Sequence, residues 1–205
     1  MKISNRRVAP PVVASSSRAA RSRNTESKPA APQKQQLTVD LPGIGTKTYT
    51  FPTRFHDVDL SSAQFLLPSS AVAQWLPPGL EPASTLGVTK GLITFQHLGN
   101  PEEMAPYSEA QLAVRVKDAR GNEAWHVLEM PVDSAENMQR GKIIFGYPKS
   151  MATVDAGAGG GTARTPSGAE LFSLRIGAAL PFGLDRHVDN EAVQVLNGEL
   201  VKLSS

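Results

Sequence analysis

The sequence predicts a mainly β protein, an antiparallel β-barrel with one or two short helices. Short runs of alternating, β-branched or aromatic residues recur from Leu37 onward, and proline or glycine ends most of them. Two turn signals, "ARGN" at residues 119–122 and Asn197–Gly198, join neighbouring runs as hairpins. Helical periodicity is confined to one short segment. Many short antiparallel strands lose their exposed edges when they close, or nearly close, into a barrel.

We predict that residues 1–36 form a disordered basic tail and that residues 37–205 form a single domain. The tail is rich in Ala, Ser, Pro, Arg and Gln and has no aromatic residue, so it cannot bury enough apolar surface to offset ordering. Its eight basic residues and one acidic residue give +7, which leaves −5 for the domain out of the total of +2. The domain therefore has no basic face for nucleic acid. The composition of the tail is also compatible with a transit peptide or an export signal, but we favour a tail without a targeting function.

The first half of the domain contains three predicted strands and the one predicted helix. The segment "SSAVAQWLPPGLEP", residues 69–82, begins with serines that suit a helix cap, and its two consecutive prolines stop the helix. We expect Ala71, Val72 and Trp75 to share one side of it. The strands before it are "QLTVDLPG", "KTYTFPTRF" and "AQFLLP", at residues 36–43, 47–55 and 63–68.

The second half of the domain continues as strands. "DAGAGGGTARTPSG", residues 155–168, is predicted to be a flexible hairpin loop, because it lacks the Gly-Lys-Ser/Thr of a phosphate-binding loop. Among the strands, 111–117 pairs with 125–130 across the "ARGN" turn. The predicted strands are "GVTKGLITFQHL", "YSEAQLAVRVKD", "EAWHVLEMPV", "GKIIFGYPK", "ELFSLRIGAALP" and the pair within "EAVQVLNGELVKL", which lie in that order between residues 87 and 203.

Composition and motifs exclude several classes of function. The chain has no cysteine, so disulfides, thiolate metal sites and a thiol nucleophile are excluded. The four histidines have no metal-ligand spacing, no Gly-x-Ser-x-Gly is present, and no apolar stretch is long enough to cross a bilayer. We therefore expect a cytoplasmic protein with no metal, cofactor or membrane partner.

Lys149 is the chemical candidate that remains. It ends the apolar run "GKIIFGYPK", in which Ile143, Ile144, Phe145 and Tyr147 would surround it. An amine attacks a carbonyl carbon only when it is unprotonated, and burial in apolar surroundings lowers the pKa of lysines in general. Composition alone favours the alternative, in which the lysine merely marks a strand end at the surface.

At this point the sequence resembles a known family. "GKIIFGYPKS" is similar to the Gly-Arg-x-x-x-Gly/Ala-Tyr/Phe-Pro-Lys-Lys segment of the acetoacetate decarboxylase family, whose first lysine after the proline is the Schiff-base nucleophile. "PYSEAQLAV" resembles the family's Tyr-x-Glu stretch, and "LPPGLEP" its Leu-Pro-x-x-Leu-Glu segment. The three segments keep their order over roughly residues 60–155. The resemblance implies a barrel or cone, a homo-oligomer, a small keto-acid substrate, catalytic Lys149 and Glu109, and substrate-binding Tyr107, Tyr147 and Lys142.

The sequence departs from the family pattern at several positions. Ser150 stands where the family has a second lysine, so burial alone would have to activate Lys149. Lys142 replaces an arginine, which keeps the charge but not the fork of donors. The family has a glutamate on the strand before the Tyr-x-Glu segment, but the corresponding position here, Thr94 or one of its neighbours, is not a glutamate. The family also has an arginine near the first strands. A gapless count puts Asp59 at that position, and Arg54 is a nearby candidate for the arginine. The family also has a longer part after the lysine segment.

The sequence leaves three functions open. The first is an acetoacetate decarboxylase-like lyase, in which Lys149 attacks the ketone and Glu109 positions the substrate or moves protons. The second is an aldolase or dehydratase that uses the same imine, which the loss of the second lysine favours. The third is a binding protein that kept the barrel and lost the reaction.

Overall fold

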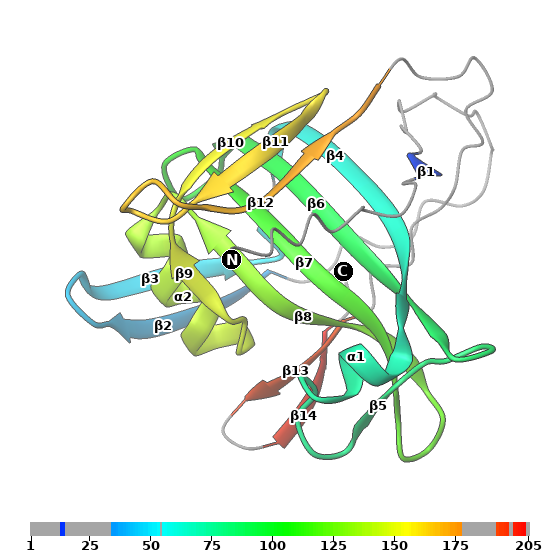
Figure 1. The fold of residues 1–205 in the computed structure, drawn as a ribbon. Helices are drawn as coiled ribbons and strands as arrows, with labels where there is room; N and C mark the ends of the chain where they lie inside the picture. Colours follow the sequence, from blue (N-terminus) through cyan, green and yellow to red (C-terminus); the bar gives the residue numbers. More distant parts are fainter. Residues whose placement is uncertain (1–12, 15–33, 54, 178–191, 197–198, 204–205) are drawn as a thin grey trace, which may run out of the picture.

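The computed structural model describes residues 13–14, 34–53, 55–177, 192–196 and 199–203. It is mainly β with two helices in this part of the chain, as the sequence predicts (Figure 1). No helix in the described ranges is long and apolar enough to span a membrane. The predicted tail falls mostly outside these residues, except for the two-residue strand β1 (Val13–Ala14), which pairs with β4, and the start of β2 at Gln35.

A nine-stranded sheet forms the body of the protein. Its order is β1-β4-β6-β7-β8-β13-β14, with β5 beside β7 and β9 beside β8. The pairs are antiparallel except that β8 runs parallel to β9 and to β13. Within the described strands, β1 and β14 end this order without pairing to each other. The bounds are β4 Phe55–Pro68, β5 Leu80–Pro82, β6 Val88–Pro101, β7 Tyr107–Asp118, β8 Glu123–Val132, β9 Lys149–Met151, β13 Ala192–Leu196 and β14 Glu199–Leu203.

Two smaller sheets accompany the large one. The hairpin of β2 (Gln35–Leu41) and β3 (Gly45–Phe51) lies beside α2 (Figure 1). A second sheet contains β10 (Thr153–Gly157), β11 (Gly160–Arg164) and β12 (Glu170–Arg175). The prediction of a loop at residues 155–168 is therefore wrong, because most of that segment is a strand pair. The predicted pair around the 197–198 turn is confirmed as β13 and β14, although the turn itself lies outside the described residues.

The two helices lie on different parts of the large sheet. Helix α1 (Ser69–Ala73) lies inside the predicted helical segment, but no side chain caps it, and only Val72 of its predicted inner side is buried, whereas Trp75 is exposed. Helix α2 (Ala135–Phe145) contradicts the prediction of a strand at residues 141–149. The Ser134 hydroxyl caps α2 by accepting the Asn137 N–H, which satisfies one of the unpaired donors at a helix start.

The large sheet is covered on both faces, and this arrangement separates the hydrophobic core from the site. Odd-numbered β6 residues such as Phe95 face the β10–β12 sheet, where Ala163 and Leu174 complete a buried cluster. The even-numbered residues, Gln96 and Leu98 among them, face the other way, toward the side that α2 covers through Met138. The site described below lies on this second face.

Gly161 is a test of the packing around β11, both within its own sheet and against β6. A Cβ atom at this position would collide with the ring of Phe95 and with the backbone carbonyl of Asp155. Backbone cannot move aside as a flexible side chain can, so we expect Gly161→Ala to lower the free energy of unfolding by about 1 to 3 kcal/mol. Urea unfolding measures this, with Gly157→Ala as the control, because a Cβ at residue 157 meets nothing within 4 Å. Equal losses in the two variants would contradict the packing argument.

Candidate active site

The end of α2 positions Lys149. Gly146 adopts a left-handed conformation with φ 67°, and the N–H groups of Gly146 and Tyr147 return to the carbonyls of Lys142 and Gly141. The chain then turns into β9, where Lys149 pairs in parallel register with Met130 of β8. This pairing directs the lysine onto the sheet face that α2 covers, and its side chain is only 7% exposed.

Gly141 allows α2 to lie directly on the lysine side chain. A Cβ atom at this position would be 2.5 Å from Cδ and 2.6 Å from Cε of Lys149. Glycine in a helix interior is unfavourable by roughly 0.5 to 1 kcal/mol relative to alanine, so its presence here has a packing reason. The aliphatic part of the lysine therefore lies between the helix backbone and the sheet, with the amine held at its far end.

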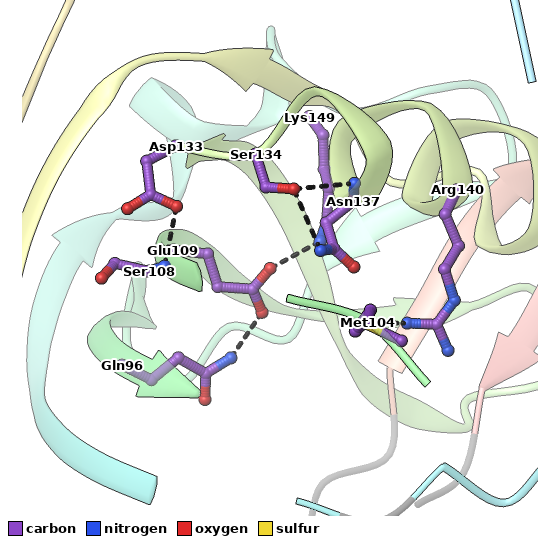
Figure 2. Close-up of polar contacts among 9 residues, drawn as sticks. All are labelled: Gln96, Met104, Ser108, Glu109, Asp133, Ser134, Asn137, Arg140 and Lys149. Atoms are coloured by element: carbon purple, nitrogen blue, oxygen red, sulfur yellow. Dashed lines mark hydrogen bonds and ion pairs between the residues drawn. The ribbon is translucent and has the colours of Figure 1, made fainter. Parts of the chain in front are cut away.

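The amine of Lys149 forms a buried ion pair with Glu109. Its Nζ donates to Glu109 Oε2 over 2.5 Å, and both side chains are 7% exposed. The other carboxylate oxygen, Oε1, accepts from Gln96 Nε2, also over 2.5 Å. Gln96 and Glu109 are opposite each other on β6 and β7, so the sheet register sets this contact. Figure 2 shows the Glu109 carboxylate between Gln96 and Lys149.

Two tyrosines lie around the ion pair. The ring of Tyr107 is 5.6 Å from Lys149 Nζ, and Tyr147 packs against the cluster of Leu92, Ala113 and Met130. Burial raises the pKa of both phenols, and the negative charge of Glu109 raises it further. Both tyrosines therefore stay neutral at ordinary pH and offer hydroxyl groups rather than charges.

The basic residue of α2 that enters the protein is Arg140, which the sequence reasoning missed. Arg140 is 6% exposed, whereas Lys142 is exposed and its side chain enters none of the hydrogen bonds or ion pairs found among the described residues. Burial lowers the pKa of Arg140, and the nearby acidic groups of Tyr107, Tyr49 and Glu109 act in the opposite direction. The buried residues of α2 are Asn137, Arg140 and Gly141, with no large apolar residue among them, so the sequence of the helix alone did not mark residue 140.

The structure places the remaining candidate positions as follows. Ser150 pairs with Pro131 and, by strand alternation, points away from the face that holds the Lys149 amine. Its buried Oγ has no hydrogen-bond partner among the described residues. Thr94 is on β6, and two residues beyond it Gln96 makes the contact with Glu109. Asp59 is exposed on β4. The Arg54 candidate lies outside the described residues.

This arrangement can perform chemistry at a carbonyl group. A buried amine next to a carboxylate can transfer a proton and then attack an electrophilic carbon, and the neutral phenols can donate hydrogen bonds. Within the described ranges, no three His, Cys, Asp or Glu residues come together as a group that could hold a metal ion.

Comparisons with known proteins bear on the family and on the fold. The sequence model of the family described as acetoacetate decarboxylase (ADC) matches residues 40–184. A search of curated proteins found no match. The fold is similar to an acetoacetate decarboxylase from Legionella pneumophila, with TM-score 0.61 and 18% identity over 89% of this chain and 77% of that one.

Two further solved structures share the fold at low identity. An acetoacetate decarboxylase-like enzyme from Sphingomonas wittichii RW1 has TM-score 0.53 and 19% identity over 72% of this chain and 70% of that one. The enduracididine biosynthesis enzyme MppR, solved with HEPES buffer bound, has TM-score 0.53 and 16% identity over 67% of this chain. The present chain spans 59% of the MppR chain in that structure.

Proposed function

This chain belongs to the acetoacetate decarboxylase family, and we propose that it is a lyase-type enzyme that acts on a small keto acid through a Schiff base at Lys149. The observation that carries the proposal is the buried pair of Lys149 and Glu109, with Gln96 fixing the second carboxylate oxygen. An ion pair buried to this degree adds little net stability, because the desolvation of the two charges offsets their attraction. Its retention on one sheet face beneath α2 is better explained by chemistry.

The proposed first reaction uses only groups of this chain. The ammonium of Lys149 gives one proton to Glu109, and the free amine attacks the ketone carbon of the substrate. The carbonyl oxygen leaves as water after it takes up two protons, one of them returned by Glu109 and the other released by the attacking nitrogen. Ammonium and ketone thus become an iminium ion and water, with charge and atoms balanced. Gln96 holds the carboxylate in place during both transfers.

The iminium ion has two possible fates. With a 3-oxo acid, the bond to the carboxyl carbon breaks, carbon dioxide leaves, and its electron pair enters the iminium group. With a 2-oxo acid, loss of a proton from the neighbouring carbon gives an enamine that can add to a second carbonyl, and the carboxylate stays. Ser150, in place of a second lysine, favours the second fate as the alternative function. MppR, of similar fold, has been solved with the condensation product of pyruvate and imidazole 4-carboxaldehyde.

Borohydride trapping tests the proposal directly. Borohydride adds hydride to the iminium carbon and converts the reversible imine to a stable secondary amine, which peptide mass spectrometry locates. We expect incubation with pyruvate or acetoacetate to give a single modified lysine, Lys149. An N-isopropyl group from acetoacetate, together with released carbon dioxide, identifies the decarboxylase. A carboxylate retained on every adduct identifies the alternative.

The control is borohydride treatment without a keto acid, which should leave the lysine unmodified. Modification of several exposed lysines to equal extents would indicate non-specific chemistry and would contradict the proposal. No adduct with any keto acid tested would instead favour a binding protein that shares the fold without the reaction.

A further inference from the structure

Arg140 is a buried cation without an acidic partner in the part of the chain that the structure describes. Its guanidinium donates to Thr53 Oγ1 over 2.9 Å and to the Met104 sulfur over 3.5 Å. Within the described residues, its buried Nε has no hydrogen-bond partner, and no carboxylate lies within the 4.0 Å of an ion pair. A guanidinium has five N–H donors, so this one retains unused hydrogen-bonding capacity.

Aromatic rings hold the guanidinium in place but do not neutralise it. The Arg140 Cζ atom is 4.9 Å from the ring centre of Tyr49, 5.3 Å from that of Phe51 and 5.7 Å from that of Phe145. Cation–π contacts of this kind attract a charge without supplying an opposite one. A buried charge is normally paired, because water no longer solvates it. The side chain is thus fixed, desolvated and ready to bind an anion.

The position of Arg140 links it to the amine of Lys149. It precedes Gly141, the residue whose backbone lies against the lysine side chain. Met104, which accepts from Arg140, packs in the same cluster as Tyr107, and the Tyr107 ring is 5.6 Å from Lys149 Nζ. Figure 2 draws the guanidinium next to Met104 in the same view as the ion pair. The effect of the Glu109 charge on the pKa of Arg140 agrees with this proximity.

We propose that Arg140 binds the carboxylate of the keto acid whose ketone carbon bonds to Lys149. This inference rests on the proposed function and adds the residue that recognises the carboxylate of the keto acid. A planar guanidinium with free donors matches a carboxylate in geometry as well as charge. It also bears on the reaction: a cation that holds the carboxylate stabilises the charged ground state more than the departing, neutral carbon dioxide. The arginine therefore favours reactions that retain the carboxylate.

The test compares two ketones of similar size, pyruvate with a carboxylate and acetone without one. We expect Arg140→Met to lower the rate of pyruvate trapping on Lys149 by about 10²-fold and to leave acetone trapping within about threefold of the unmodified protein. Arg140→Lys, which keeps the charge and loses the fork, should give an intermediate rate with pyruvate only. Arg115→Met is the matched control, because Arg115 also stacks on an aromatic ring, that of Trp125. Arg115 lies near the end of β7, whereas Tyr107, beside Lys149, lies at its start.

The outcomes separate this inference from the proposed function. Equal losses with pyruvate and acetone would overturn the role of Arg140, because a structural defect affects both ketones alike. No adduct with either ketone in the unmodified protein would instead overturn the Schiff base itself. Since Arg140→Met can also impair folding, Thr53→Val provides a milder variant that removes one hydrogen bond to Arg140. Thr53→Val should slow pyruvate trapping and leave acetone trapping unchanged. Equal changes in the two rates, or a change with acetone alone, would overturn the inference.

Discussion

Lys149→Met abolishes the trapped adduct with every keto acid and lowers the free energy of unfolding by about 3 to 5 kcal/mol. Methionine has no amine to form the imine, so no residual trapping on this peptide is expected. The stability loss arises because Glu109, whose side chain is 7% exposed, is left buried without its cationic partner. Mass spectrometry after borohydride treatment measures the first effect, and urea unfolding near neutral pH measures the second.

The double variant Lys149→Met/Glu109→Gln separates the two effects. Removing both charges eliminates the uncompensated carboxylate, so most of the lost stability should return while the adduct stays absent. A glutamine at residue 109 still presents an oxygen to Gln96. If Lys149→Met forms adducts as fast as the unmodified protein, another lysine is the nucleophile and the proposed mechanism is wrong.

The sequence allowed prediction of most strands and of two members of the candidate site. Alternation and turn signals identified β6, β7 and β8 because each strand carries its own pattern. Lys149 was a candidate from its place in the sequence, the family resemblance supported it and added Glu109, and the structure brings the two together as a buried pair. Gln96 could not be assigned in the same way, because its role depends on the register between β6 and β7, a property of two strands and not of one segment.

The error at residues 141–149 has a physical explanation. Ile143, Ile144 and Phe145 are typical strand residues, yet they form the last turn of α2. The decisive signals lie upstream, where the Ser134 side chain caps the helix and Glu136 lies in the first turn. Once the helix has started there, it continues through these apolar residues until the left-handed Gly146. Local propensity was overridden by a cap nine to eleven positions upstream.

The glycines at residues 155–168 were misinterpreted for a different reason. Glycine is rare in strands and frequent in loops, so a cluster of glycines favours a loop on composition. Here Gly160 has φ 117° and approaches the backbone of Leu174, and Gly161 lies against Phe95. Gly160 thus permits a close approach of the neighbouring strand and Gly161 a close approach of the large sheet, and neither approach is visible in a single segment. The same reason accounts for Gly141 in α2.

Gly141→Ala gives a folded protein that forms its adduct at least about 10²-fold more slowly. The added methyl group would lie 2.5 Å from Cδ of Lys149, so the lysine side chain must shift. A displacement of about 1 Å at a reacting group is enough for a loss of this size. Stability should change little, because the gain in helix propensity of up to about 1 kcal/mol offsets part of the crowding. Trapping rates with pyruvate and the thermal midpoint measure the two quantities.

Gln139→Ala serves as the control on the same helix. Two residues in a helix differ by roughly 200° around its axis, so residue 139 lies on nearly the opposite side from residue 141. Gln139→Ala should leave the trapping rate unchanged. Any decrease of this rate in Gly141→Ala is then due to the contact with Lys149. If Gly141→Ala traps pyruvate at the normal rate, the lysine side chain swings freely and α2 does not hold the amine. In that case the reactivity of Lys149 depends on Glu109 and burial alone.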